Sequence, residues 1–195
     1  MKRISYNSPV ILTFAILSFA VLWIAWLTNN ASNLAFFSVY SSSIRDWQAW
    51  VRLFGHALGH VDMAHYTNNM LLLLMVGPML EEKYGSLRML AMIAFTAVVT
   101  GLVHIIIADT VLLGASGIVF MLILLSSVTN IRKGTIPLTL VFAVIIYLGK
   151  EIISGVSLKD NISHLAHIIG GICGVFLGVV INNDKTDKYK DTELL

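Results

Sequence analysis

Residues 164–180 read HLAHIIGGICGVFLGVV, an apolar stretch in which small residues recur at every fourth position. Series of this small-x-x-x-small kind let two membrane helices approach backbone to backbone. His167 lies beside the series, and Gly171 follows it by one helical turn on the same face. We therefore expect a membrane helix that packs closely against a neighbour and presents a histidine to it. The series consists of Ala166, Gly170, Gly174 and Gly178.

The composition around this stretch is typical of an integral membrane protein. Of the 195 residues, 57% are hydrophobic and 12% are charged, whereas soluble domains average about 45–50% apolar and about 25% charged residues. The net charge of +2 is too small to indicate a nucleic-acid partner, and the single cysteine excludes an intramolecular disulfide. The sequence thus predicts an all-α membrane protein.

Apolar runs of spanning length recur along the chain, since a transmembrane helix needs about 20 apolar residues. The first run, Pro9 to Leu27, exceeds the roughly 7–15 residues of a signal-peptide core, so we expect a retained span. The prediction is a six-transmembrane-helix domain over residues 9–182, with a cytoplasmic N-terminus at 1–8 and a cytoplasmic charged tail at 183–195. The spans are expected at about 9–28, 65–80, 87–107, 116–131, 136–153 and 163–182.

The basic residues are distributed unequally between the two sides that six spans create. Nine of the 13 Lys and Arg residues fall at the termini and in the loops near residues 84 and 133. Because Lys and Arg favour the cytoplasmic side, both termini are expected in the cytoplasm. The long connection 29–64 is then extracytoplasmic.

Four polar residues in the predicted spans fall at one depth. Counted from the cytoplasmic helix ends at ~1.5 Å per residue, they lie roughly 18–24 Å up, in the outer part of a ~30 Å hydrocarbon core. Polar side chains inside a membrane are costly and are functional candidates by default. We therefore predict one site built from three helices. Its members are His65, Asn69, Ser116 and His167.

The segment around Ser116 indicates the chemistry of this site. Gly114 permits a positive φ and a sharp turn into a helix, so Ser116 would stand at a helix N-terminus, where free N–H groups favour negative charge. Gly117 leaves room for the helix that carries His167. A serine beside a histidine is an activated nucleophile. Oxyanion donors would be the N–H of Ser116 and the side chains of Asn69 and His65.

Four motifs follow one another in the sequence. They are GHALGHVDMAHYTNN at 55–69, Glu81 followed by Gly85-Ser86, GASG at 114–117, and AHIIGGICG at 166–174. In this order and spacing they resemble the rhomboid family of intramembrane serine proteases, in its minimal six-helix type, over roughly residues 45–180. The resemblance implies a serine endopeptidase that cleaves transmembrane proteins near the outer membrane face.

Carried over position by position, the resemblance makes Ser116 the nucleophile and His167 the general base. His65 and Asn69 would donate to the oxyanion, and Gly114 would shape the oxyanion hole. The implied partners are transmembrane protein substrates and membrane lipids, with no nucleic acid, no cofactor and no metal. The implied location is a prokaryotic cytoplasmic (inner) membrane, and the oligomeric state stays open.

Two positions depart from the family pattern. The family often has Trp-Arg before the outer histidines, where this chain has Val51-Arg52, and often a tyrosine four residues after the serine, where it has Phe120. Phe120 still offers a surface on which an imidazole can stack. Structural roles are expected for Arg52, His56, His60, Glu81, Gly117, Phe120, Gly170, Gly171 and Gly174.

The remaining histidines leave alternatives open. His164 is a rival base, but it lies ~4.5 Å higher than His167, and His104 is expected to be an interfacial packing residue. His56, His60 and His65 have a spacing that suits zinc, which allows a histidine-lined metal transporter, although the chain lacks H-E-x-x-H. A further alternative is a catalytically inactive rhomboid relative that binds membrane clients.

Overall fold

The chain is helical in the computed structural model, which describes residues 5–43, 45–128, 138–143, 145 and 162–192. Among these residues there is no strand, only an isolated antiparallel bridge between Val39 and Leu112. The all-α class predicted from the sequence is thus confirmed. The helices are α1 (Pro9–Leu27), α2 (Ala31–Phe36), α3 (Trp47–Gly55), α4 (Met63–Tyr84), α5 (Ser86–Ile107), α6 (Ser116–Val128), α7 (Leu138–Ala143) and α9 (Ile162–Thr192).

Among the described residues, three helices are long and apolar enough to cross a membrane: α1, α5 and the His164–Ile181 part of α9. They coincide with the first, third and sixth predicted spans, and the second and fourth predicted spans fall in α4 and α6. Most of the predicted fifth span, 136–153, lies outside the described residues. Helix α9 continues to Thr192, into the charged residues that were expected to form a tail.

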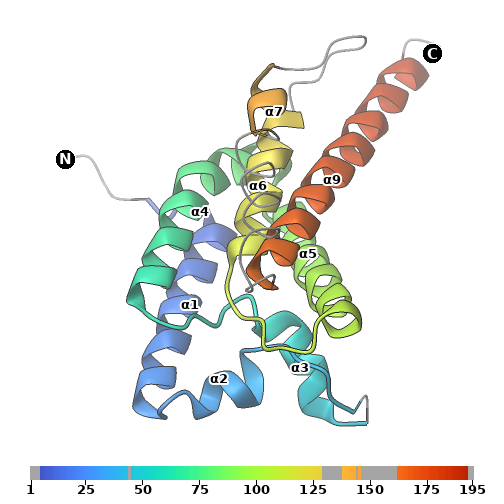
Figure 1. The fold of residues 1–195 in the computed structure, drawn as a ribbon. Helices are drawn as coiled ribbons and strands as arrows, with labels where there is room; N and C mark the ends of the chain where they lie inside the picture. Colours follow the sequence, from blue (N-terminus) through green and yellow to red (C-terminus); the bar gives the residue numbers. More distant parts are fainter. Residues whose placement is uncertain (1–4, 44, 129–137, 144, 146–161, 193–195) are drawn as a thin grey trace.

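Helix α6 is the centre of the bundle, with α4, α5 and α9 around it (Figure 1). All of its 13 residues are buried except Ser116 and Ser126, which are half-buried. A helix that is apolar on every side must be surrounded, and its closest neighbour is α9. The short helices α2 and α3 lie at one end of the bundle, and the turn from α4 to α5 lies at the other (Figure 1).

The loop from α5 to α6 turns back into the bundle, so that α6 begins well inside it (Figure 1). The loop is fixed by backbone hydrogen bonds to the segment before α3 and to the end of α3. The N–H and C=O of Val39 pair with those of Leu112 at 2.8 and 2.9 Å, and the N–H of Gly114 donates to the carbonyl of His56 at 2.8 Å. These bonds satisfy buried main-chain groups and set the position at which α6 starts.

Glu81, near the end of α4, connects two elements at the end of the bundle opposite to α2 and α3. Its carboxylate is buried and accepts hydrogen bonds from the N–H groups of Val10 (2.9 Å) and Ile11 (3.0 Å) and from the Ser86 hydroxyl (2.7 Å). A negative charge at the start of α1 also interacts favourably with the helix dipole. Glu81 therefore joins α1 to the turn between α4 and α5, where Gly85 has a φ of 83°.

Glu81→Gln is expected to lower the thermal unfolding midpoint by roughly 4–8 °C. The amide keeps one acceptor oxygen but turns an NH₂ toward a backbone N–H, and hydrogen bonds to charged groups contribute about 1.5–3 kcal/mol each. The matched control is Glu82→Gln, because Glu82 is the exposed neighbour in the same helix. Equal midpoints for the two variants, measured in detergent, would show that Glu81 does not cap α1.

Candidate active site

Ser116 is the first residue of α6 and is half-buried. Two residues earlier, Gly114 has a φ of 129°, as its place before the helix predicted. A residue that carries a Cβ is strained at this positive φ, so the turn into α6 depends on glycine at position 114. The turn places the serine at a helix N-terminus, where backbone N–H groups lack intrahelical partners.

Helices α6 and α9 touch backbone to backbone along the glycine series. A Cβ added to Gly170 would collide with the carbonyl group and Cα of Gly117, and one added to Gly174 would collide with the carbonyl oxygen of Met121. From the other side, a Cβ on Gly117 would lie 3.3 Å from the carbonyl oxygen of Ala166. The close packing that the small-residue series predicted is confirmed, and its tightest point is one turn after His167.

The imidazole of His167 lies flat on the ring of Phe120. The ring centroids are 4.4 Å apart and the planes differ by 6°, so the predicted stacking surface is confirmed. Ser116 precedes Phe120 by four residues and shares its face of α6. The imidazole is thereby held next to the helical turn that carries the serine. The ring of His164 stands edge-on to that of His167, with centroids 6.5 Å apart.

Two side chains of α4 face the turn before Ser116. A Cβ added to Gly114 would lie 2.9 Å from Nε2 of His65 and 3.8 Å from Nδ2 of Asn69. Asn69 is 6% exposed, and its Nδ2 has no hydrogen-bond partner in the described part of the chain. Buried donors are normally satisfied, so an unsatisfied one here suits a group that binds a ligand atom.

His65 is positioned by the start of its helix. Asp62 is the N-cap of α4, and its carboxylate accepts a hydrogen bond from the main-chain N–H of His65 at 2.7 Å. The ring of His60 packs edge-on against the ring of His65, at 5.0 Å between centroids. Burial, together with the neighbouring His65, lowers the pKa of His60 to about 4. His60 is therefore neutral at neutral pH and places an uncharged ring beside His65.

His56 links three elements around the site. Its Nδ1 lies 3.2 Å from the carbonyl oxygen of Arg52, so this nitrogen carries the proton. Its Nε2 lies 3.4 Å from the hydroxyl of Thr100 on α5, and its own carbonyl accepts from Gly114. Burial lowers the pKa of His56 to about 4. His56 thus supports the turn before Ser116 as a neutral residue.

Arg52 holds the connection before α3 in place. Its guanidinium donates to the Ser42 hydroxyl at 2.8 Å and pairs with Asp46 at 3.2 Å. The same group lies over the Tyr40 ring, 4.5 Å from the centroid. Arg52 is 2% exposed, whereas the neighbouring Val51 is exposed. Of the family's Trp-Arg pair, this chain therefore retains the arginine, which is buried, and has Val51 at the exposed position.

His104 is a packed residue in the last turn of α5, and the structure adds a hydrogen-bond partner that the sequence did not reveal. It is 1% exposed, and its Nε2 lies 2.9 Å from the carbonyl oxygen of Thr110, in the loop that leads to α6. Only a protonated ring nitrogen can donate to a carbonyl, so Nε2 carries the proton. The hydrogen bond ties the end of α5 to the start of this loop. No sequence pattern connects a histidine to a main-chain carbonyl six residues later, which is why its role was missed.

His56, His60 and His65 are the residues whose spacing suits a metal ion. Within the described ranges, no three His, Cys, Asp or Glu side chains lie close enough to hold a metal ion. Both ring nitrogens of His56 face protein oxygen atoms, and Nδ1 of His60 lies 3.1 Å from the carbonyl oxygen of Leu58. These histidines serve as hydrogen-bonding groups.

Comparison with known proteins assigns this chain to a family. The family model described as the Rhomboid domain matches residues 47–183, and the chain therefore belongs to the rhomboid family and is an integral membrane protein. It is 29% identical over 161 residues to the Rhomboid protease GluP of Bacillus subtilis (strain 168), an alignment that covers 80% of this chain and 31% of that relative. The chain thus spans about a third of the relative's length.

Proposed function

We propose that this chain is an intramembrane serine endopeptidase that cleaves transmembrane substrates near the outer membrane face. The observation that carries the proposal is the stack of His167 on Phe120, one helical turn from Ser116. His167 takes the hydroxyl proton of Ser116 as the oxygen attacks the scissile carbonyl, and it returns the proton to the leaving amine. Water then hydrolyses the acyl-enzyme with the same base.

In a Ser-His-Asp triad, a buried aspartate orients the histidine. A Ser-His dyad has no such aspartate, so its histidine must be oriented in another way. We assign this task to the flat contact with Phe120 and to the backbone contact of Gly170 with Gly117. Both contacts lie within one turn of His167 and restrict its ring and its main chain. The base is thereby oriented by packing between α6 and α9.

The proposed arrangement in the membrane has six spans with both termini in the cytoplasm of a prokaryotic cell. Residues 9–182 form the protease domain, 1–8 precede it, and 183–195 are a charged cytoplasmic tail. Helices α2 and α3 then lie at the outer face, and the turn from α4 to α5 lies at the inner face. Ser116 is reached from the outer side, where water for hydrolysis is available.

His65 and Asn69 are proposed to bind the oxyanion, with Gly114 shaping the hole between them. His65→Ala is expected to lower kcat by about 10²–10³-fold, the usual effect of removing one oxyanion donor. Asn69→Ala should cost less, because the N–H of Ser116 and His65 remain. KM should change little, since the oxyanion forms only in the transition state.

The matched control for this prediction is Asn68→Ala, because Asn68 is the exposed neighbour of Asn69 in α4. It should keep wild-type kcat. Rates are measured on a single-span fluorescent substrate in proteoliposomes, over a range of substrate densities. A change in KM alone for His65→Ala or Asn69→Ala would contradict an oxyanion role.

The proposed function is tested with the purified protein and a type I single-span membrane protein as substrate. We expect the wild type to cleave it, and we expect a fluorophosphonate probe to label the wild type but not Ser116→Ala. Absence of both cleavage and labelling would favour a client-binding rhomboid relative without activity. Cleavage that is abolished by EDTA and retained by Ser116→Ala would favour metal chemistry at the histidines.

A further inference from the structure

Helix α3 exposes apolar side chains and buries its charge. Its one charged residue, Arg52, is buried and turns inward to Asp46 and Ser42. A helix at the surface of a protein in water normally has polar side chains on its exposed face. The opposite arrangement in α3 indicates that its exposed face meets an apolar medium. The exposed residues of this face are all large and apolar: Trp47, Trp50, Val51 and Phe54.

The place where α3 crosses α5 gives the depth of α3. A Cβ added to Gly101 of α5 would lie 3.2 Å from Cδ2 of Leu53 and 3.6 Å from its carbonyl oxygen, so the two helices pack together at this position. Helix α5 is a spanning helix and continues from Gly101 to Ile107, roughly 9 Å along its axis. Leu102, Ile106 and Ile107 in this last part are exposed. The membrane-facing surface of α5 therefore extends past the level at which α3 crosses it.

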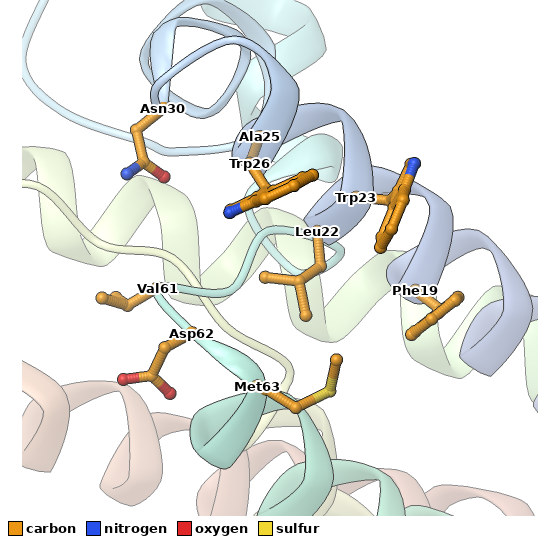
Figure 2. Close-up of a pocket in the computed structure, with 9 residues that line it drawn as sticks. All are labelled: Phe19, Leu22, Trp23, Ala25, Trp26, Asn30, Val61, Asp62 and Met63. Atoms are coloured by element: carbon orange, nitrogen blue, oxygen red, sulfur yellow. The ribbon is translucent and has the colours of Figure 1, made fainter.

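The four tryptophans of the chain indicate the same level. Trp23 and Trp26 are exposed near the end of α1, beside the entry to α4 (Figure 2). Trp47 and Trp50 are exposed on α3, which lies at the same end of the bundle as the end of α1 (Figure 1). Tryptophan side chains gather at the boundary between acyl chains and headgroups. The tryptophans of α1 and α3 therefore belong to one aromatic belt.

We propose that α3 is embedded in the bilayer leaflet at this end of the bundle. Val51 and Phe54 contact acyl chains, and Trp47 and Trp50 lie at the boundary with the headgroups. A charge at this depth is costly, which explains why Arg52 turns inward.

The composition of the face favours lipid over a protein partner. Protein interfaces have a polar rim and about one hydrogen bond per 100–200 Å², whereas Val51 and Phe54 offer no polar group and the two tryptophans offer only their indole N–H groups. The exposed face of α3 is also continuous with the lipid-facing surface of α5. The inference does not depend on the chemistry proposed for Ser116.

The test measures what surrounds single spin labels on the full chain in lipid nanodiscs, with one protein per disc. Cys173, the single cysteine of the chain, is replaced by alanine, and labels are attached in Val51→Cys and in Phe54→Cys. Ile106→Cys is the reference for lipid, because Ile106 is 80% exposed on the spanning helix α5. Asp109→Cys is the reference for water, because Asp109 is exposed in the loop just after α5. Power-saturation EPR compares collisions with oxygen, which concentrates in lipid, and with a water-soluble nickel complex.

We expect both α3 labels to match Ile106→Cys, with collisions with the nickel complex about tenfold fewer than in Asp109→Cys. Nickel collisions as frequent as in Asp109→Cys would place the face in water and overturn the proposal. Protection from both oxygen and nickel would also overturn it, because the chain itself would then cover the face. Circular dichroism verifies the helical content of each variant, and the two α3 positions test the proposal independently of each other.

Discussion

Ser116→Ala and His167→Ala are each expected to lower kcat for substrate cleavage by roughly 10⁴-fold or more. The double variant is expected to be no slower than either single variant. A nucleophile and its base act as one unit, so once either is lost the other contributes little. Single-turnover assays in proteoliposomes measure this, because they separate the chemical step from product release.

The controls come from the same two helices. Ser126→Ala removes the other half-buried serine of α6, whose hydroxyl donates to the carbonyl of Ile123 at 2.7 Å. His164→Ala removes the rival base, which lies edge-on to His167. Both should keep most of the activity. Loss of activity in His164→Ala together with activity in His167→Ala would move the base to His164.

Local and periodic features of this chain could be predicted from the sequence. The series Ala166, Gly170, Gly174 and Gly178 predicted a close contact because small residues at every fourth position fall on one face of a helix. Gly114 predicted a positive φ because glycine adopts this conformation freely. Such features depend on neighbours along the chain, and the sequence contains them directly.

Contacts between distant segments could not be predicted in the same way. Glu81 bonds to main-chain N–H groups about 70 residues earlier, and the pairing of Val39 with Leu112 joins two loops. Main-chain groups are the same at every position, so no side-chain pattern marks the partner. The motif around Glu81 indicated that the residue matters, but only the fold gives the reason.

The sequence also left open which glycine controls the base. Gly171 shares the helix face of His167, but it is Gly170 that lies against the backbone of Gly117. The neighbour of α9 is set by the position of α6 in the bundle, which periodicity along α9 alone does not determine. The substitution that tests this contact is therefore placed at Gly170.

Gly170→Ala is expected to lower kcat by about 10²-fold, with KM nearly unchanged. The added Cβ meets the main chain of Gly117, and a backbone cannot move aside as a flexible side chain can. Helix α9 must shift away from α6, and a displacement of about 1 Å in a catalytic group can cost 10²-fold in rate. Gly174→Ala meets the main chain of Met121 one turn further on and should have a smaller effect of the same kind.

Gly178→Ala is the matched control for this contact, because its Cβ would meet the side chain of Val128, 2.7 Å from Cγ1. This contact is with a side chain at the far end of α6, and the position is about three turns beyond His167, so a local shift there leaves the imidazole in place. Alanine favours a helix more than glycine by about 1 kcal/mol, so none of the three variants weakens α9 itself. Activity and the rate of fluorophosphonate labelling should fall in parallel in Gly170→Ala and stay close to wild type in Gly178→Ala, since labelling requires the same activated serine. Wild-type labelling in Gly170→Ala would show that the backbone contact between Gly170 and Gly117 does not position His167.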